Sequence, residues 1–572
     1  MSHKLRRLKI VAYAVNGSGL GHLTRVLAVL RWAGRLARLS GVRLETYVLT
    51  SSEAPGLAFE EGFATFKIPS KTAVRRAGLP KEEYLRLARQ WVWHSVGLVQ
   101  PDVLLVDTFP GGSFGELIHA LDVARARVFI RRAVKEEFAR AAGVRSLLPL
   151  YDRILVPGEP DAPPPEADAS VAAKTRHVGP IMLRSREELR PREEARRRLG
   201  IPDGKLAVWL SAGGGGDPHA GSAVERLVGA LRAEPDLHLV VGAGPLYGGA
   251  PLRGPNITWV ADFNAMQDFA GLDFAVSAAG YNSFHELLHA RVPVAFFAQE
   301  KVADEQARRV RAASEAGCAL SVGTAADGGP RVEDLRRVLE EFRDAGRRAE
   351  IALRAGEFVP ANSARDAAFE VLATVLPLDV LEEAAEIGTP DFFLTLAAHG
   401  VEAEDVERVN RRLKTVAELD AEERRDLMLR LVSQAGTDGR AAVRLFTALA
   451  PQVSVVTQAD AEELVGAATR VAASASFADE RALSELLRAL PVDERTRAAE
   501  LAEALCRFLG ALDARGDSVW RGRSVLARHL AGARVTEALA AAAEEIQNGS
   551  LAPTDFQGDA FTGDEHGRSY GD

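Results

Sequence analysis

A glycine-rich turn that ends in a histidine is the part of this sequence best suited to chemistry. Gly19, Gly21 and His22 lie between an apolar run (8–15) and an amphipathic run (23–39). The pattern predicts a strand, a tight turn and a helix, because glycine allows the backbone to turn sharply and to approach a ligand closely. A helix N-terminus behind such a turn offers free N–H groups to a phosphate. His22 would stand at the mouth of the turn, where its imidazole could act as a base.

The turn alone does not specify a ligand. Its glycines lack the spacing of the dinucleotide-binding motif, and no Lys-Ser or Lys-Thr pair follows them as in the phosphate-binding loop of NTPases. An ordinary connection between a strand and a helix, with a surface histidine, is the alternative.

A second group of residues, far along the chain, combines a glycine, an amide, a hydroxyl and a carboxylate in the run Gly280-Tyr-Asn-Ser-Phe-His-Glu286. Asn282 and Ser283 are expected at a helix N-terminus, where they could cap the helix or bind phosphate. Glu286, one turn later, could accept hydrogen bonds from two vicinal ribose hydroxyls. Gly280 would let the backbone approach the ligand.

Aromatic and polar residues flank this run. Trp259 could stack on a base, or it could be a core residue at a strand end, in which case Phe263 would line the base pocket. Asp304 and Gln306 could bind sugar hydroxyls, or they could be ordinary surface residues.

The order of these residues resembles the nucleotide-sugar-binding signature of GT-B glycosyltransferases. In the plant members, a Trp is followed by Gly-Trp-Asn-Ser-x-x-Glu, a Gly-Val-Pro turn and Asp-Gln; here Gly280–Glu286, Val292-Pro293 and Asp304–Gln306 keep that order. Residues 8–370 are also similar to the bacterial transferase that adds N-acetylglucosamine to the lipid-linked peptidoglycan precursor, and to UDP-sugar hydrolases. Two features depart from the plant signature: Ala278 replaces a phosphate-binding histidine, and Asp304-Glu-Gln306 is one residue longer.

The resemblance implies inverting transfer of a sugar from a nucleotide diphosphate, expected to be UDP, to an acceptor that the sequence does not identify. His22 would be the base, and Asp107, at the end of an apolar run, would orient its imidazole unless Asp107 is only a cap or turn residue. No Asp-x-Asp motif follows a strand in the expected place, so we expect neither a metal ion nor a cofactor. The residues expected to bind the donor are Gly19, Gly21, Gly213, Gly214, Trp259, Phe263, Gly280, Asn282, Ser283, Glu286, Asp304 and Gln306.

Two segments alternate short apolar runs with helical periodicity, which is typical of parallel sheets covered by helices. The expected strands are Ile10–Val15, Leu44–Leu49, Val103–Val106, Arg127–Ile130 and Ile154–Val156, then Leu206–Leu210, Leu237–Val241, Ile257–Val260, Phe274–Val276, Val294–Phe297 and Ala319–Val322. We therefore expect an α/β fold of two facing doubly wound Rossmann-like domains (GT-B) at 1–165, on the acceptor side, and 166–375, which binds the nucleotide sugar. Both glycine-rich turns would then border one cleft.

The remaining sequence predicts a helical domain at 376–550 and a disordered tail at 551–572, because glycine becomes rare and Ala, Leu, Glu and Arg dominate until the tail. The helical domain carries no chemical motif. We expect it to dock a partner, to dimerise or to cover the acceptor side of the cleft.

Composition limits the classes of partner. The net charge of -8 indicates no general affinity for nucleic acid, and the two cysteines fit a reducing, cytoplasmic compartment. No secretion signal and no membrane span are expected. The arginines of the 23–39 run are expected to form a solvated face, with peripheral membrane contact as the alternative; they are Arg25, Arg31, Arg35 and Arg38.

Two other functions fit the same residues. In a UDP-sugar hydrolase, water would replace the acceptor and His22 would still serve as the base. In a non-catalytic scaffold, the chain would bind a nucleotide sugar or a partner without turnover.

Overall fold

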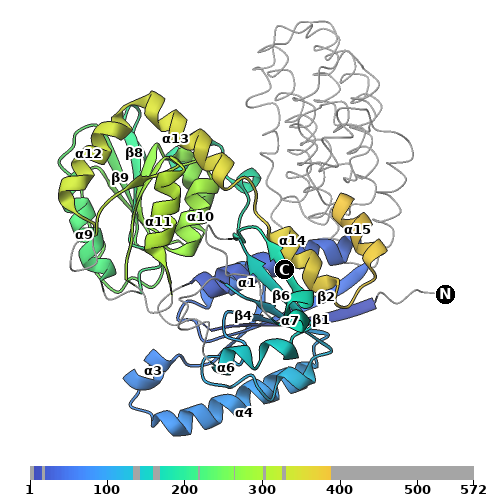
Figure 1. Cartoon of the computed structure of the whole chain (residues 1–572). Helices are drawn as coiled ribbons and strands as arrows, with labels where there is room; N and C mark the ends of the chain where they lie inside the picture. Colours follow the sequence, from blue (N-terminus) through green and yellow to red (C-terminus); the bar gives the residue numbers. More distant parts are fainter. Residues whose placement is uncertain are drawn as a thin grey trace, which may run out of the picture. The chain divides into compact units, whose positions relative to one another are not determined.

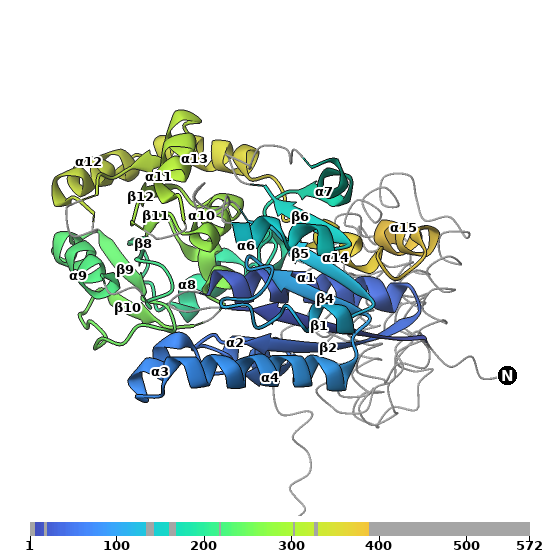
Figure 2. The same ribbon diagram turned by 60° about the horizontal axis from the view of Figure 1, so that its bottom comes forward.

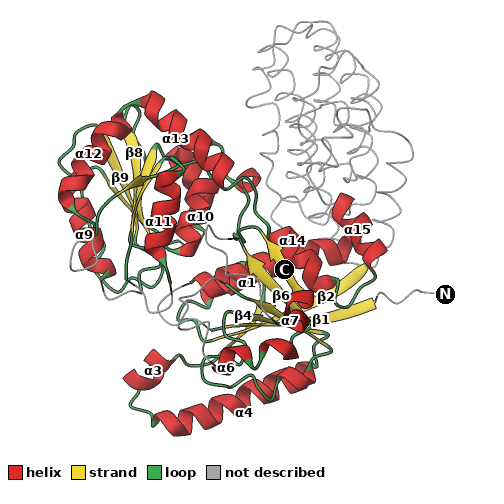
Figure 3. Ribbon diagram, in the orientation of Figure 1, coloured by secondary structure: helices red, strands yellow, loops and turns green. Residues whose placement is uncertain are grey.

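The computed structural model describes residues 6–15, 20–132, 142–158, 168–216, 219–262, 264–300, 304–324 and 330–387. Within them lie two β-sheets covered by helices (Figures 1 and 3). One compact unit, Arg7–Gly34 with Leu44–Pro377, holds almost all of both sheets. The second unit contains Leu378–Asp572, of which the structure describes the helix α15 (Leu378–Ile387). The rest of the predicted helical domain and the predicted tail lie outside the described residues.

The first sheet has seven strands among the described residues, in the order β3-β2-β1-β4-β5-β6-β7. Its strands are β1 (Arg6–Ala14), β2 (Val42–Thr50), β3 (Ala64–Lys67), β4 (Val103–Asp107), β5 (Ala126–Ile130), β6 (Arg153–Pro157) and β7 (Thr175–Val178). The helices that follow these strands are α1 (Gly21–Leu39), α2 (Gly56–Glu60), α3 (Lys71–Arg76), α4 (Lys81–Val99), α6 (Ala142–Arg145) and α7 (Ala169–Lys174). Figure 2 shows α4 along one side of β1 and β2 and α1 along the other.

The second sheet is parallel throughout and has the order β10-β9-β8-β11-β12-β13. Its strands are β8 (Leu206–Ser211), β9 (Leu237–Gly242), β10 (Ile257–Val260), β11 (Phe274–Ala278), β12 (Val294–Phe297) and β13 (Leu320–Ser321). Its helices are α8 (Arg192–Arg198), α9 (Ala220–Leu231), α10 (Tyr281–His289), α11 (Gln306–Glu315), α12 (Val332–Arg343) and α13 (Ala345–Phe358), followed by α14 (Ala364–Leu372).

Strand alternation builds a core on each face of the second sheet. Val208 and Leu210 of β8 point to the face covered by α9 and α12, whereas Ala207 and Trp209 point to the face covered by α10, α11 and α13. Successive residues of a strand face opposite sides, so a strand buried on both sides must be apolar throughout. This is why β8, β9, β11 and β12 stand out in the sequence as continuous apolar runs.

All eleven predicted strands are confirmed, with ends that differ by a few residues at most. β3 and β7 were not predicted from the sequence. Neither is an apolar run: β3 is mostly exposed, and β7 reads Thr-Arg-His-Val with an exposed Arg176 and His177. Short strands at the edges of a sheet bury little and so carry a weak sequence pattern.

The boundary predicted between the two α/β domains needs correction. β7 pairs with β6 and completes the first sheet, although it lies after residue 165. Helix α14 also returns to the first sheet: Glu370 lies 3.3 Å from Arg153 of β6, and α14 packs on β6 and β7. The segment 166–375 is therefore not one domain, because both of its ends belong to the first sheet.

The two sheets share one topology. In each, the chain moves outward to one edge through three strands and then restarts on the other side of the first strand. The order reverses between β1 and β4 and between β8 and β11. Doubly wound sheets bind ligands beyond the carboxyl ends of the strands at this reversal.

Candidate functional site

The carboxyl ends of β1 and β4 bring the first turn and Asp107 together. Ala14 of β1 is paired in register with Asp107, the last residue of β4. The turn that leaves β1 leads into α1, of which Gly21 is the first residue and His22 the second. Gly19 lies outside the described residues.

His22 and Asp107 are in direct contact. The Nδ1 atom of His22 lies 2.9 Å from Oδ2 of Asp107, whose side chain is fully buried, while the His22 side chain is 18% exposed. Burial alone would raise the pKa of Asp107, but the Arg25 guanidinium and His22 outweigh it and hold the pKa below the ordinary value. An ionised carboxylate only accepts hydrogen bonds, so Nδ1 of His22 carries the proton and Nε2 carries the lone pair.

Arg25 is the third member of this cluster, although it was expected on a solvated face of its helix. Its Nε and Nη2 atoms donate to the two oxygens of Asp107 at 3.2 and 2.8 Å, and its side chain is fully buried. Thr108 donates to the same carboxylate at 3.1 Å. The prediction of a solvated face is wrong for Arg25, and also for Arg31, which pairs with Glu188 at 2.6 Å and is 14% exposed. Carboxylates from distant segments, invisible in the local helical pattern, account for the burial of both arginines.

The strand order of the second sheet also reverses, between β8 and β11. Ser211, the last residue of β8, is paired with Ser277 of β11. The turn after β8 has positive φ at Gly213 (+91°) and Gly215 (+83°), and a Cβ on Gly215 would lie 2.5 Å from the carbonyl oxygen of Ala243. Only glycine fits there, so the sequence of glycines sets the path of this turn.

The two glycine-rich turns lie side by side. A Cβ on Gly21 would lie 3.8 Å from Oδ1 of Asn282, and a Cβ on Gly214 would lie 3.7 Å from the Leu20 side chain. Asn282 donates a hydrogen bond to the hydroxyl of Thr24 in α1. The turn after β1, the turn after β8 and the start of α10 are therefore direct neighbours.

Helix α10 begins next to the two glycine-rich turns, and no side chain of the described residues caps its N-terminus. Its N-cap is Gly280, where an added Cβ would meet no atom within 4 Å. Asn282 and Ser283 do not cap the helix, which corrects that part of the prediction; Asn282 is turned toward Thr24, and Ser283 is half-buried in the first turn. The first amides of α10 thus remain available to a ligand.

Glu286 lies on the second turn of α10 and is half-buried. Burial raises the pKa of its carboxyl to about 7. Among the described residues, no side chain or amide donates a hydrogen bond to it. A partly buried carboxylate without a hydrogen-bond donor is strongly stabilised by a ligand that supplies hydroxyl donors.

Asp304 and Gln306 are already engaged with protein groups. Asp304 pairs with Arg309 at 2.6 Å and with Arg132, and the Gln306 side chain also bonds to it. Gln306 is 3% exposed, and its Oε1 accepts the Gln299 amide at 3.0 Å. Both ends of the Gln306 amide thus bind the protein, and its contact with the donor sugar stays a prediction.

Trp259 serves the core of the second sheet. It is half-buried, packs against the core on the α9 side of the sheet, and meets the Tyr247 ring edge-on at 5.2 Å. This placement favours the core interpretation over base stacking. Phe263 lies outside the described residues.

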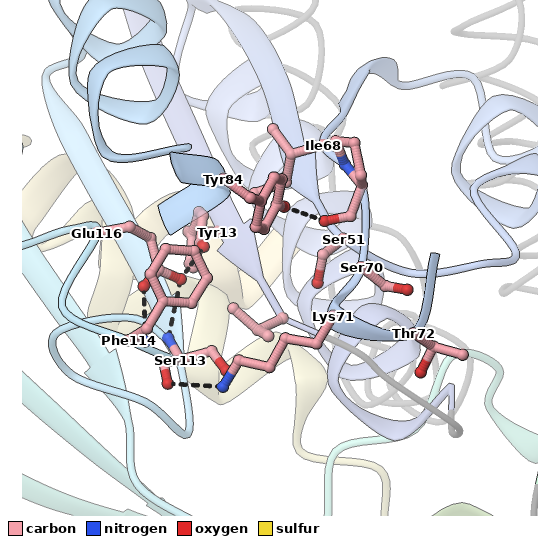
Figure 4. Close-up of a pocket in the computed structure, with 12 residues that line it drawn as sticks. Tyr13, Ser51, Ile68, Ser70, Lys71, Thr72, Tyr84, Ser113, Phe114 and Glu116 are labelled. Atoms are coloured by element: carbon pink, nitrogen blue, oxygen red, sulfur yellow. Dashed lines mark hydrogen bonds between the residues drawn. The ribbon is translucent and has the colours of Figure 1, made fainter. Parts of the chain in front are cut away.

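A small pocket of about 70 Å³ lies at the carboxyl ends of β1, β2 and β3 (Figure 4). Glu116 lines the pocket and is only 1% exposed, and its carboxylate accepts hydrogen bonds from the Ser113 and Phe114 amides, each at 2.8 Å, and from the Tyr13 hydroxyl. Lys71 reaches across the pocket to the Ser113 carbonyl at 3.1 Å. Glu116 was not predicted from the sequence, because its contacts depend on a loop that folds back on the end of β1.

In the part of the chain that the structure describes, no three His, Cys, Asp or Glu side chains gather as a metal site would require. None of the described helices has the length and apolarity needed to cross a membrane.

No protein-family model matches the chain. A stretch of 73 residues is 40% identical to an uncharacterized glycosyltransferase of Methanopyrus kandleri and covers 12% of this chain and 20% of that protein. The match thus spans about a fifth of the relative's length.

Three solved structures are similar to 64–65% of the chain. They are MurG of Acinetobacter baumannii (16% identity, TM-score 0.42, 99% of that chain), the glycotransferase of kitacinnamycin (16%, 0.43, 100%) and Os79 of O. sativa in complex with UDP (14%, 0.46, 100%).

Proposed function

We propose that the chain is a glycosyltransferase that moves a sugar from a nucleotide diphosphate, with UDP as the expected nucleotide, to a hydroxyl acceptor. The observation that carries the proposal is the meeting of two strand-order reversals. The His22–Asp107 pair stands at the reversal of the first sheet, and the Gly213–Gly215 turn and the start of α10 stand at the reversal of the second. The first sheet supplies a base, and the second sheet supplies backbone amides that can bind a diphosphate.

The donor is proposed to lie along α10. Its diphosphate would accept hydrogen bonds from the first amides of α10 and from the turn at Gly213–Gly215, and Glu286 would bind the ribose hydroxyls. The 40% identity to a protein named as a glycosyltransferase, though confined to 73 residues, agrees with this assignment.

The proposed reaction is a direct displacement with inversion. The acceptor oxygen bonds to the anomeric carbon and gives its proton to Nε2 of His22. The bond from that carbon to the β-phosphate oxygen breaks, and its electron pair goes to that oxygen. Asp107 holds the His22 tautomer, and fixed N–H dipoles stabilise the charge that develops on the leaving group.

A panel of nucleotides and nucleotide sugars tests the proposal. Purified protein should gain thermal stability with at least one of UDP, TDP, GDP and ADP, because a ligand of the native state stabilises by mass action. With the matching sugar nucleotide, slow release of free sugar without an acceptor supports a transferase, and rapid stoichiometric release identifies a hydrolase. Release that is unchanged by EDTA supports transfer without a metal. Binding of a nucleotide sugar without any turnover would identify a non-catalytic scaffold and contradict the proposal.

The pH dependence of turnover should follow His22. Burial lowers the pKa of its imidazole below the ordinary value of about 6.5, and Arg25 and Arg132 lower it further against the opposing effect of Asp107. The base form therefore persists below that pH, so kcat at saturating donor should stay level from pH 8 to pH 6.5 and fall only in more acidic buffer. A fall centred above pH 7 in kcat at saturating donor would contradict this assignment.

Glu286→Gln should weaken UDP binding by about 10- to 100-fold, the range expected for hydrogen bonds to a charged group. Because the carboxyl ionises near pH 7, UDP should bind the wild type more tightly at pH 8 than at pH 6, and this difference should disappear in the variant. Inorganic pyrophosphate, which has no ribose, is the matched control ligand and should bind both proteins alike. Equal losses for UDP and pyrophosphate would contradict a ribose contact.

A further inference from the structure

Thr108, which directly follows Asp107, has a strained backbone. Its φ is +65°, and the Phe109 amide donates to the Asp107 carbonyl at 2.8 Å, which closes a γ-turn centred on Thr108. γ-turns with a positive φ are rare, and a β-branched side chain makes that conformation still less favourable. Gln100 and Arg291 are the other non-glycine residues of the described chain with a positive φ, and neither is β-branched. Strain of this kind persists where the surrounding structure imposes it, and it gathers at functional sites.

Fixed neighbours on both sides of Thr108 impose this conformation. The Thr108 amide donates to the Ile130 carbonyl at 2.9 Å, so it continues the pairing of β4 with β5. Two residues later, the Pro110 carbonyl accepts a hydrogen bond from the Tyr151 hydroxyl at 2.5 Å. Thr108 itself is 7% exposed. The chain therefore has to turn at Thr108, between the end of a paired strand and a loop that is held from the other side.

The γ-turn brings two side chains to the His22–Asp107 pair. The Thr108 hydroxyl donates to Oδ1 of Asp107 at 3.1 Å, and the Phe109 ring lies 5.7 Å from the His22 ring, centre to centre. If β4 instead continued through residue 108, the side chain there would point to the opposite face of the sheet from Asp107, because successive residues of a strand alternate. The strained turn is thus what lets Thr108 reach the carboxylate.

The Thr108 hydroxyl supplies one of four hydrogen bonds to the Asp107 carboxylate. Oδ2 accepts from Nδ1 of His22 at 2.9 Å and from Nη2 of Arg25 at 2.8 Å, and Oδ1 accepts from Nε of Arg25 at 3.2 Å and from Thr108. A carboxylate has about four acceptor positions, so these bonds use its full capacity. Each donor also draws on the negative charge, so Thr108 affects both the direction of the His22 hydrogen bond and its strength.

We propose that Thr108 is a positioning residue for sugar transfer, whose strained turn keeps the Asp107 carboxylate aimed at His22 and weakens the hold of that carboxylate on the imidazole proton. This inference rests on the proposed function. By drawing charge to Oδ1, the hydroxyl makes protonated His22 less stable, so Nε2 keeps its lone pair in more acidic solution. In the sequence, Thr108 is only the first polar residue after the aspartate that ends an apolar run.

Profiles of kcat against pH at saturating donor, for the wild type, Thr108→Val and Thr108→Ser, test the inference. Thr108→Val keeps the branched shape but lacks the hydroxyl. Its kcat on the level part of the profile should fall about 10-fold, the low end for a hydrogen bond to a charged group. The acidic fall of its profile should move upward by about 0.5 pH unit, because more charge on Asp107 stabilises the imidazolium. Thr108→Ser keeps the hydroxyl and should stay within about threefold of the wild type.

The other charges around His22 are the same in these variants. Asp107 of β4, Arg25 of α1 and Arg132, which follows β5, are the charged groups that act on the His22 pKa, and neither substitution removes one of them. Thr175→Val is the matched control. It deletes a hydroxyl that donates to the Val171 carbonyl at 2.8 Å, in the edge strand β7, and should change neither kcat nor the profile.

The outcomes separate the inference from the proposed function. If the wild type transfers sugar and Thr108→Val, folded by circular dichroism, keeps the wild-type profile, the inference is overturned while the proposed function stands. A lower kcat with an unmoved acidic fall would show a structural role alone and also overturn it. If Thr108→Val does not fold, Thr108→Gly, which fits a positive φ and lacks the hydroxyl, should show the same shift, and its absence there overturns the inference. A wild type that turns over no nucleotide sugar would end both.

Discussion

Replacing His22 by alanine should reduce the rate of sugar transfer by about 10²- to 10⁴-fold, the range that general-base catalysis supplies. The base is the Nε2 lone pair, which exists because ionised Asp107 holds the proton on Nδ1 at 2.9 Å. The imidazole contributes to the attack and not to nucleotide binding, so the affinity for UDP should change by less than about threefold. Initial rates of UDP release from a UDP-sugar, together with calorimetric titration of UDP, measure both quantities.

A histidine on the surface provides the control. His94 lies on the exposed side of α4, and His94→Ala should leave rate and affinity unchanged. If His22→Ala keeps the wild-type rate, or if it loses UDP affinity in proportion to rate, His22 is not the base.

Asp107→Asn should cost both stability and activity. The substitution leaves the fully buried Arg25 guanidinium without its carboxylate, and breaking a buried ion pair by removing one partner costs about 3–5 kcal/mol. An amide also no longer fixes the His22 tautomer, which in a comparable His–Asp pair costs about 10⁴-fold in kcat. Urea-induced unfolding and rates of UDP release measure the two effects.

Two further variants separate the effects of Asp107→Asn. The double variant Arg25→Met with Asp107→Asn should recover much of the stability, because it removes the unpaired charge, and should recover none of the activity. Asp152→Asn removes a carboxylate that is 40% exposed and pairs with Arg127; it should cost less than about 1 kcal/mol. A double variant as unstable as Asp107→Asn alone would show that the Arg25 charge is not the cause.

The apolar strands and both turns could be predicted because each depends on local sequence, whereas the polar edge strands β3 and β7 could not. Buried parallel strands are continuous apolar runs, as in β8 and β11, and the glycines at 213 and 215 are required by positive φ values. The pairing of His22 with Asp107 was expected from the resemblance to GT-B glycosyltransferases, and the register of Ala14 with Asp107 is what brings the two strand ends together.

The electrostatic part of the site could not be predicted in this way. Arg25 has the helical spacing of a surface residue, and only the carboxylate of β4 explains its burial. Arg132 meets Asp304 across 172 positions of sequence. Such pairs depend on how distant segments pack, which neither periodicity nor motif spacing encodes.

The polar edge of the first sheet was also missed for a physical reason. β7 and α14 are held by backbone pairing with β6 and by the Arg153–Glu370 pair. Backbone pairing needs no particular side chain, so the segment Thr175–Val178 carries no strand pattern.

A crystal structure with bound UDP tests the central claim most directly. We expect the diphosphate between the Gly213–Gly215 turn and the first amides of α10, with Nε2 of His22 facing the β-phosphate across the space that the sugar would fill. A diphosphate bound elsewhere, or separated from His22 by protein side chains, would contradict the account.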